Sequence, residues 1–187
     1  MGSPRSYRFR PAINKRWAAI KAQLEREPTD FLLHGGDLTR DGQTHSFELR
    51  QAAEDLHTLP FPTYIIPGNM DVGNKHTTVN GAKKRWDPLG LGWYDPALNM
   101  TSKRLKLFAQ IYGEINWTFI HKDVRFSGFY AAVAGSGLPQ EQQFWNFMES
   151  LPTLEPTKHH VAIMHYWLFM EFPDEPDWDL TNEEEYD

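Results

Sequence analysis

Polar residues with metal-binding chemistry follow three short apolar runs of this 187-residue chain. They are Asp37 after 30–34, Asn69 with Asp71 after 63–66, and His165 after 161–164. A carboxylate, an amide oxygen and an imidazole together form a plausible first shell for Mn²⁺, Fe or Zn²⁺. A carboxylate can also bridge two cations about 3.5–4 Å apart, and that pair can hold a hydroxide for in-line attack on phosphorus. The residue types therefore favour a metal site, and attack on phosphorus is one reaction that such a site can support.

Alternating strands and helices are expected to position these residues in an α/β fold. The expected elements are a helix over 11–27, a strand over 30–34, a helix over 46–59 and a strand over 63–66. Thr44 or Ser46 is the expected N-cap of the second helix. Strand, helix and strand in this order imply a parallel pair. Ligand sites gather at the carboxyl ends of such strands, which is where Asp37 and Asn69 stand.

The second half of the chain changes character. An irregular insertion or lid is expected over 72–102, because no periodicity survives there. A β-hairpin over 117–132, a helix over 139–151 and a last strand over 161–164 follow, with His159 and His160 as a polar approach to that strand. We expect one domain over 1–170 and an acidic tail over 171–187.

Composition excludes several classes of protein. Hydrophobic residues make up 40% of the chain and charged residues 24%, as in ordinary globular proteins. The net charge is -6, and with little basic clustering we expect no nucleic-acid partner. Without cysteines there are no disulfides or thiolate metal ligands. The sequence has no secretory leader pattern and no apolar run approaching the ~20 residues of a membrane span, so we expect a cytoplasmic protein without membrane contact.

The residues that follow the strands resemble the sequence blocks of calcineurin-like metallophosphoesterases. The similar segments are Gly-Gly-Asp-Leu-Thr at 35–39, Pro-Gly-Asn-Met-Asp at 67–71 and Ala-Ile-Met-His at 162–165. The tract 126–145 is similar to the middle of the cyclic-nucleotide-phosphodiesterase-like members, and the whole resemblance spans about 10–170. It implies a sandwich of two mixed β-sheets flanked by helices. It also implies hydrolysis of small phosphomonoesters or phosphodiesters by two divalent ions (Mn, Fe or Zn).

The resemblance also assigns roles to individual residues. It implies that Asp37 bridges the two metals, that Asn69 binds the second metal and faces the phosphate, and that His165 binds the same second metal. Asn69 and Asp71 are the expected catalytic participants. Met70 stands where the family has the His thought to protonate the leaving group, and a thioether carries no proton. Losing a general acid costs roughly 10²–10⁴-fold in rate, least for esters with acidic leaving groups.

Two departures from the family leave other interpretations open. The family's first block, Asp-x-His, and its last, Gly-His-x-His, have no counterpart here, so we expect a domain incomplete at both ends. The chain would then be a non-catalytic fragment or pseudoenzyme that binds a partner, or a product that does not fold alone. On simpler grounds, Asp37 and Asn69 could be turn residues, and His165 a hydrogen-bonded histidine at a strand end.

Overall fold

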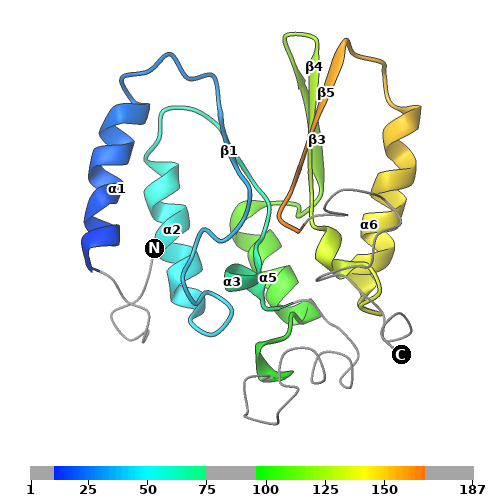
Figure 1. The fold of residues 1–187 in the computed structure, drawn as a ribbon, viewed down its shortest axis with the longest axis horizontal. Helices are drawn as coiled ribbons and strands as arrows, with labels where there is room; N and C mark the ends of the chain where they lie inside the picture. The colour runs from blue at the N-terminus through cyan, green and yellow to red at the C-terminus, as the bar shows by residue number, and fades with distance from the viewer. Residues whose placement is uncertain (1–10, 75–95, 167–187) are drawn as a thin grey trace, which may run out of the picture.

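The computed structural model describes residues 11–74 and 96–166. Its longer elements, in chain order, are α1 (Pro11–Leu24), β1 (Leu32–His34), α2 (Ser46–His57), β2 (Thr63–Ile65), α5 (Ser102–Tyr112), β3 (Trp117–His121), β4 (Val124–Phe129), α6 (Pro139–Ser150) and β5 (His159–Met164) (Figure 1). Short helical turns lie between them: α3 (Asn69–Val72), η1 (Pro96–Leu98), η2 (Ala131–Val133) and η3 (Leu151–Thr153).

Two sheets lie between layers of helices. β1 and β2 pair in parallel, and a second sheet has the order β3-β4-β5, antiparallel in its first pair and parallel in its second. Figure 1 shows α1 and α2 on the outer side of the first sheet and α6 on the outer side of the second. The expected α/β architecture of two sheets flanked by helices is confirmed. The parallel pairing predicted for the strands now seen as β1 and β2 is also confirmed, and over the described residues it is the second sheet that is mixed.

Helix α2 contributes one apolar face to the hydrophobic core. Leu49, Ala52, Ala53 and Leu56 recur at helical spacing and are at most 5% exposed. Leu49 and Leu56 belong to one hydrophobic cluster with Phe108 of α5, which is fully buried. Burying a side chain of the size of Leu or Phe contributes roughly 1.5–3 kcal/mol. The core therefore anchors the helices that carry the first sheet.

An aromatic layer joins the two sheets to each other. The rings of Tyr64 and Phe119 stack with their centroids 3.9 Å apart. The ring of Phe31 meets that of Phe119 edge-on, with a centroid distance of 5.2 Å. The indole Nε1 of Trp117 donates to the carbonyl of Ile65 across the same interface at 2.9 Å. Aromatic pairs add about 0.5–1.5 kcal/mol each beyond their buried area. These contacts hold the sheets so that the carboxyl ends of β1, β2 and β5 meet.

Several elements differ from the sequence-based expectation. Helix α5 was not predicted, because only Leu105 and Phe108 in it are buried among many polar neighbours. Strand β5 begins at His159 and not at 161, since pairing with β4 extends to that residue. The N-cap position of α2 is His45, not Thr44 or Ser46, and it makes no side-chain cap bond.

The predicted insertion over 72–102 is only partly described. Its first residue, Val72, completes α3, and an isolated bridge joins Asn74 to Asn99, which lies between η1 and α5. Residues 75–95 of that segment and the acidic tail over 171–187 lie outside the described residues. Among the described residues, no helix combines the length and the apolar character that crossing a bilayer requires.

Candidate metal centre

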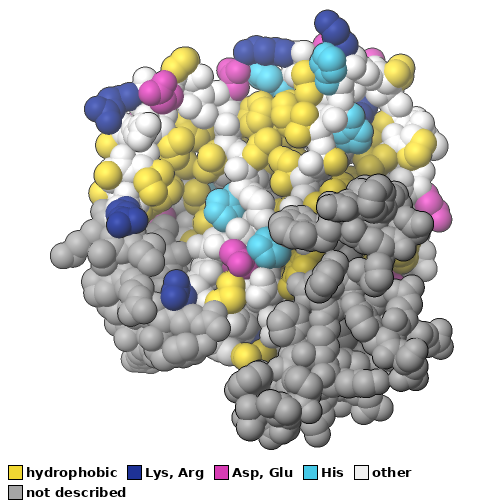
Figure 2. Space-filling view, in the orientation of Figure 1, with side chains coloured by type: hydrophobic (Ala, Val, Ile, Leu, Met, Phe, Trp, Pro, Cys, Tyr) yellow, Lys and Arg dark blue, Asp and Glu magenta, His cyan; other side chains and the backbone are white. Residues whose placement is uncertain are grey.

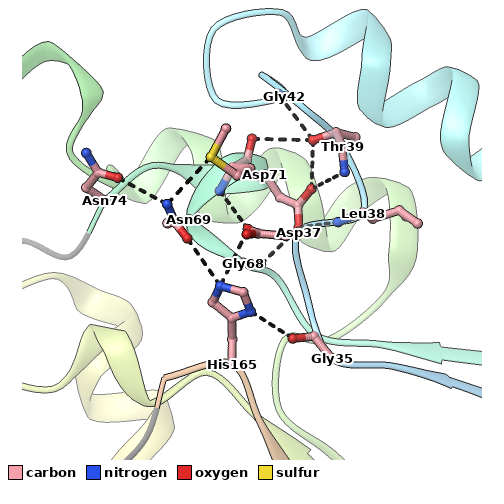
Figure 3. Close-up of polar contacts among 11 residues, drawn as sticks. Gly35, Asp37, Leu38, Thr39, Gly42, Gly68, Asn69, Asp71, Asn74 and His165 are labelled. Atoms are coloured by element: carbon pink, nitrogen blue, oxygen red, sulfur yellow. Dashed lines mark hydrogen bonds and ion pairs between the residues drawn. The ribbon is translucent and has the colours of Figure 1, made fainter. Parts of the chain in front are cut away.

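Three predicted ligands from separate segments meet at one point. Asp37 follows β1, Asn69 follows β2 as the first residue of α3, and His165 follows β5. The imidazole Nε2 of His165 lies 3.2 Å from Asn69 Oδ1 and 3.5 Å from Asp37 Oδ1 (Figure 3). In the space-filling view, histidine and acidic side chains lie together near the middle of the face shown (Figure 2). The structure thus brings together the residues that the sequence proposed as metal ligands.

The imidazole of His165 is oriented by a backbone carbonyl. Its Nδ1 lies 2.8 Å from the carbonyl oxygen of Gly35, which can only accept, so Nδ1 carries the hydrogen. In the neutral ring, Nε2 then presents a lone pair toward the oxygens of Asn69 and Asp37. Metal-binding histidines are commonly held in this way, with the second nitrogen bonded to a carbonyl or carboxylate.

The loop conformation around Asp37 follows from local chemistry. Gly36 and Asp37 both have positive φ, at 96° and 56°. Glycine adopts such angles freely, and Asp is among the few other residues that tolerate the left-handed region. The backbone N–H of Met70 donates to Asp37 Oδ1 at 2.9 Å, which ties the carboxylate to the loop after β2. The side chain stays 38% exposed, so a ligand from solvent can reach it.

Asp71 lies beside the centre, and its carboxylate also joins two loops of the structure. Its carboxylate is buried and accepts four hydrogen bonds: from the backbone N–H of Leu38, Thr39 and Gly68 and from the Thr39 hydroxyl, over 2.7–3.2 Å. Burial raises the pKa of the Asp71 carboxyl, and the bonds from Thr39 and Gly68 partly offset that rise. Asp71 therefore fastens the loop after β1 to the loop after β2.

The two loops approach so closely that side chains would not fit between them. A Cβ on Gly68 would lie 2.3 Å from both the backbone N and Oδ1 of Asp37, and 2.8 Å from His165 Cε1. Gly68 has ordinary extended angles (φ -113°, ψ 176°), so the requirement is for space alone. The glycine is needed because the backbone of one loop touches the ligand of the other.

Gly68→Ala is accordingly expected to weaken the centre. The methyl group should cost about 1–3 kcal/mol of folding free energy and displace Asp37 from His165. Gly35→Ala is the matched control, because nothing lies within 4 Å of its Cβ position. Thermal unfolding and Mn²⁺ titration of the two variants check this. Equal behaviour of both variants would contradict the close-approach argument.

Two buried rings lie near the ligands. Burial lowers the pKa of His34, against the opposing charges of Asp71 and Asp37. Burial also raises the pKa of Tyr130 well above its usual range, and the charges of Tyr166 and Asp71 act in the same direction. Both groups thus favour their neutral forms, so neither ring adds a charge beside the ligands.

A second group of ligand-type side chains was not predicted. Asp41, His45 and Glu48 each offer an atom within 4.8 Å of the others, and both carboxylates are buried. Glu48 Oε2 accepts from the backbone N–H of Arg40 and Asp41, so this carboxylate closes the turn before α2. The sequence signal was the spacing of Asp41, His45 and Glu48 around a helix start, where the sequence analysis predicted only an N-cap at Thr44 or Ser46. The Glu48 carboxylate thus has a structural role, and none of the three residues is among the predicted ligands.

Comparison with known families agrees with the fold. The model of the calcineurin-like phosphoesterase family matches residues 10–182. This range is most of the 187-residue chain, and the chain therefore belongs to the calcineurin-like phosphoesterase family. The resemblance stated from the sequence blocks is confirmed at this level. The comparison with curated proteins finds no match.

The residues present fit a divalent cation. Three lone-pair atoms from a carboxylate, an amide and an imidazole face one another, and they repel unless a cation or a proton lies among them. Gly36 and Gly68 lack side chains, and a Cβ atom on either would lie within 3 Å of the His165 ring. The two glycines therefore allow the loops after β1 and β2 to approach this imidazole. The donor set is of the mixed oxygen and nitrogen type that suits Mn²⁺, Fe or Zn²⁺.

Proposed function

We propose that this chain hydrolyses small phosphate esters with the help of divalent cations, and that phosphodiesters are favoured over monoesters. The observation that carries the proposal is the meeting of His165 Nε2 with the oxygens of Asn69 and Asp37, at 3.2 and 3.5 Å. Membership of a phosphoesterase family supports the reaction class. A centre of two ions, with Asp37 between them and Asn69 and His165 on the second, is the arrangement that the resemblance implies.

The chain's own residues would divide the work. Bound divalent cations supply Lewis acidity and an activated water at neutral pH. Asp37 provides the negative charge of the site, His165 provides a nitrogen ligand fixed by Gly35, and Asn69 provides an amide oxygen on the side open to a phosphate. Met70 offers no proton to a leaving group, so esters with acidic leaving groups are the substrates expected to turn over.

Hydrolysis of an activated aryl phosphodiester by metal-stripped protein tests the proposal. We expect turnover only after Mn²⁺ is added, and a loss of about 100-fold or more in His165→Ala, because that change removes a ligand and not merely an outer partner. His121→Ala is the matched control. His121 is the last residue of β3, pairs with Asp30 and takes no part in the centre. Metal-independent turnover, or equal loss in both variants, would count against the proposal.

A binding module of the same fold is the second candidate. It is favoured by Met70, which leaves the loop after β2 without a proton donor at that position. Saturable Mn²⁺ binding without turnover of aryl or alkyl esters would support this alternative, whereas turnover would exclude it.

A further inference from the structure

Asn69 presents its oxygen, and not its nitrogen, to the other ligands. The amide group has two orientations of nearly the same shape, and only the one with Oδ1 toward His165 can bind a cation. In the observed orientation, Nδ2 points the opposite way and donates to Asn74 Oδ1 at 3.3 Å and to Met70 Sδ at 3.6 Å (Figure 3). Two neighbouring acceptors therefore bind Nδ2 when the Asn69 oxygen faces His165.

The reversed orientation would block the site. With Nδ2 facing inward, Asn69 would donate a hydrogen bond to the lone pair of His165 Nε2 and would turn its own oxygen away, so that two of the three ligand atoms would no longer be available to a cation. Its oxygen would then face Met70 Sδ, which cannot donate a hydrogen bond. Met70 and an acceptor at position 74 thus bias the amide in the same direction.

The position of Asn74 does not depend on its side chain. Its backbone N–H donates to the carbonyl of Leu98 at 2.8 Å, and its carbonyl accepts from the N–H of Met100 at 2.7 Å. Both bonds tie the end of α3 to the segment before α5, and neither is lost when the side chain is changed. The backbone of Asn74 is therefore held beside Asn69, within reach of the hydrogen bond between the two side chains.

We propose that Asn74 is a positioning residue, which holds the amide of Asn69 with its oxygen toward His165 and Asp37 and so keeps the centre ready for a cation. This inference rests on the proposed function. No feature of the sequence blocks pointed to Asn74, because it lies outside them and meets Asn69 only through the turn after α3. Outer partners of metal ligands typically contribute about 10–100-fold to metal affinity.

Three variants test the inference. Asn74→Leu removes the acceptor at similar size, and its Mn²⁺ affinity is expected to fall about 10-fold or more. Asn74→Asp keeps an acceptor and cannot donate, so we expect its Mn²⁺ affinity to be no more than about 3-fold weaker than that of the parent chain. Asn146→Leu makes the same change at an exposed site on α6 and should leave the affinity unchanged. Calorimetric titration of metal-stripped protein gives the affinities, and thermal unfolding confirms that each variant is folded.

A second readout needs no metal. In the metal-free parent chain, nuclear Overhauser effects should connect the Asn69 amide protons to the β-protons of Asn74. In Asn74→Leu they should connect to Hε1 of His165, and in Asn74→Asp they should return to residue 74. If the parent chain binds no Mn²⁺, the proposed function fails and these contacts alone decide the inference. Unchanged contacts in Asn74→Leu would overturn it, even if the parent chain binds metal.

Discussion

Asp37→Asn is expected to lose Mn²⁺ binding, with the affinity falling by at least about 100-fold. The change keeps the shape of the side chain but removes the negative charge beside His165 Nε2. Asp71 cannot replace that charge, because its oxygens already accept bonds from Leu38, Thr39 and Gly68. Loss of an outer partner costs about 10–100-fold, and loss of a charged ligand should exceed that range.

Calorimetric titration of the metal-stripped chain measures this effect. Asp123→Asn is a matched control, because Asp123 also has positive φ (62°, against 56° for Asp37) and lies in the turn between β3 and β4. Asn tolerates the left-handed region as Asp does, so neither variant should be strained. Saturable binding in Asp37→Asn at the parent affinity would remove Asp37 from the centre.

Asp71→Asn is expected to destabilise the fold by about 3 kcal/mol and to weaken metal binding indirectly. The amide nitrogen must replace an oxygen that now accepts hydrogen bonds. Placed at Oδ2 it would oppose the N–H groups of Leu38 and Gly68, and placed at Oδ1 it would oppose that of Thr39. A charge-assisted bond contributes about 1.5–3 kcal/mol, and an unsatisfied buried donor adds a further penalty.

Urea unfolding monitored by tryptophan fluorescence measures the change in free energy. Glu54→Gln serves as the control, since it makes the same acid-to-amide replacement at an exposed position of α2. Its unfolding free energy should change by no more than about 0.5 kcal/mol. A stability of Asp71→Asn equal to that of Glu54→Gln would show that the carboxylate does not join the two loops.

The different surroundings of Asp37 and Asp71 explain the different results expected for the two substitutions. Asp37 and Asp71 both follow short parallel strands, and the residue types alone allow either to hold a metal or to form a turn. Of the residues that donate to Asp71, Gly68 is local, but Leu38 and Thr39 come from a loop more than thirty positions away in sequence. Long-range contacts of this kind depend on how the loops pack, and local sequence patterns do not report them.

Local sequence patterns were sufficient for the periodic elements. The apolar spacing in α2 and the glycine pair after β1 predicted a helix and a strand end, because helix periodicity and glycine turns are local properties. The same argument failed for α5, whose buried face is narrow, and for the start of β5, which is set by pairing with β4.

The sequence by itself determined the residue chemistry of the candidate centre: a carboxylate, an amide and an imidazole, each directly after a strand. Only the tertiary structure decided that His165 reaches Asn69 and Asp37 and that Asn74 backs the amide of Asn69. The physical reason is that the end of a strand and the polar residue after it are neighbours in the sequence, so a local pattern predicts both. The meeting of His165 with residues about a hundred positions earlier depends instead on the aromatic packing between two sheets.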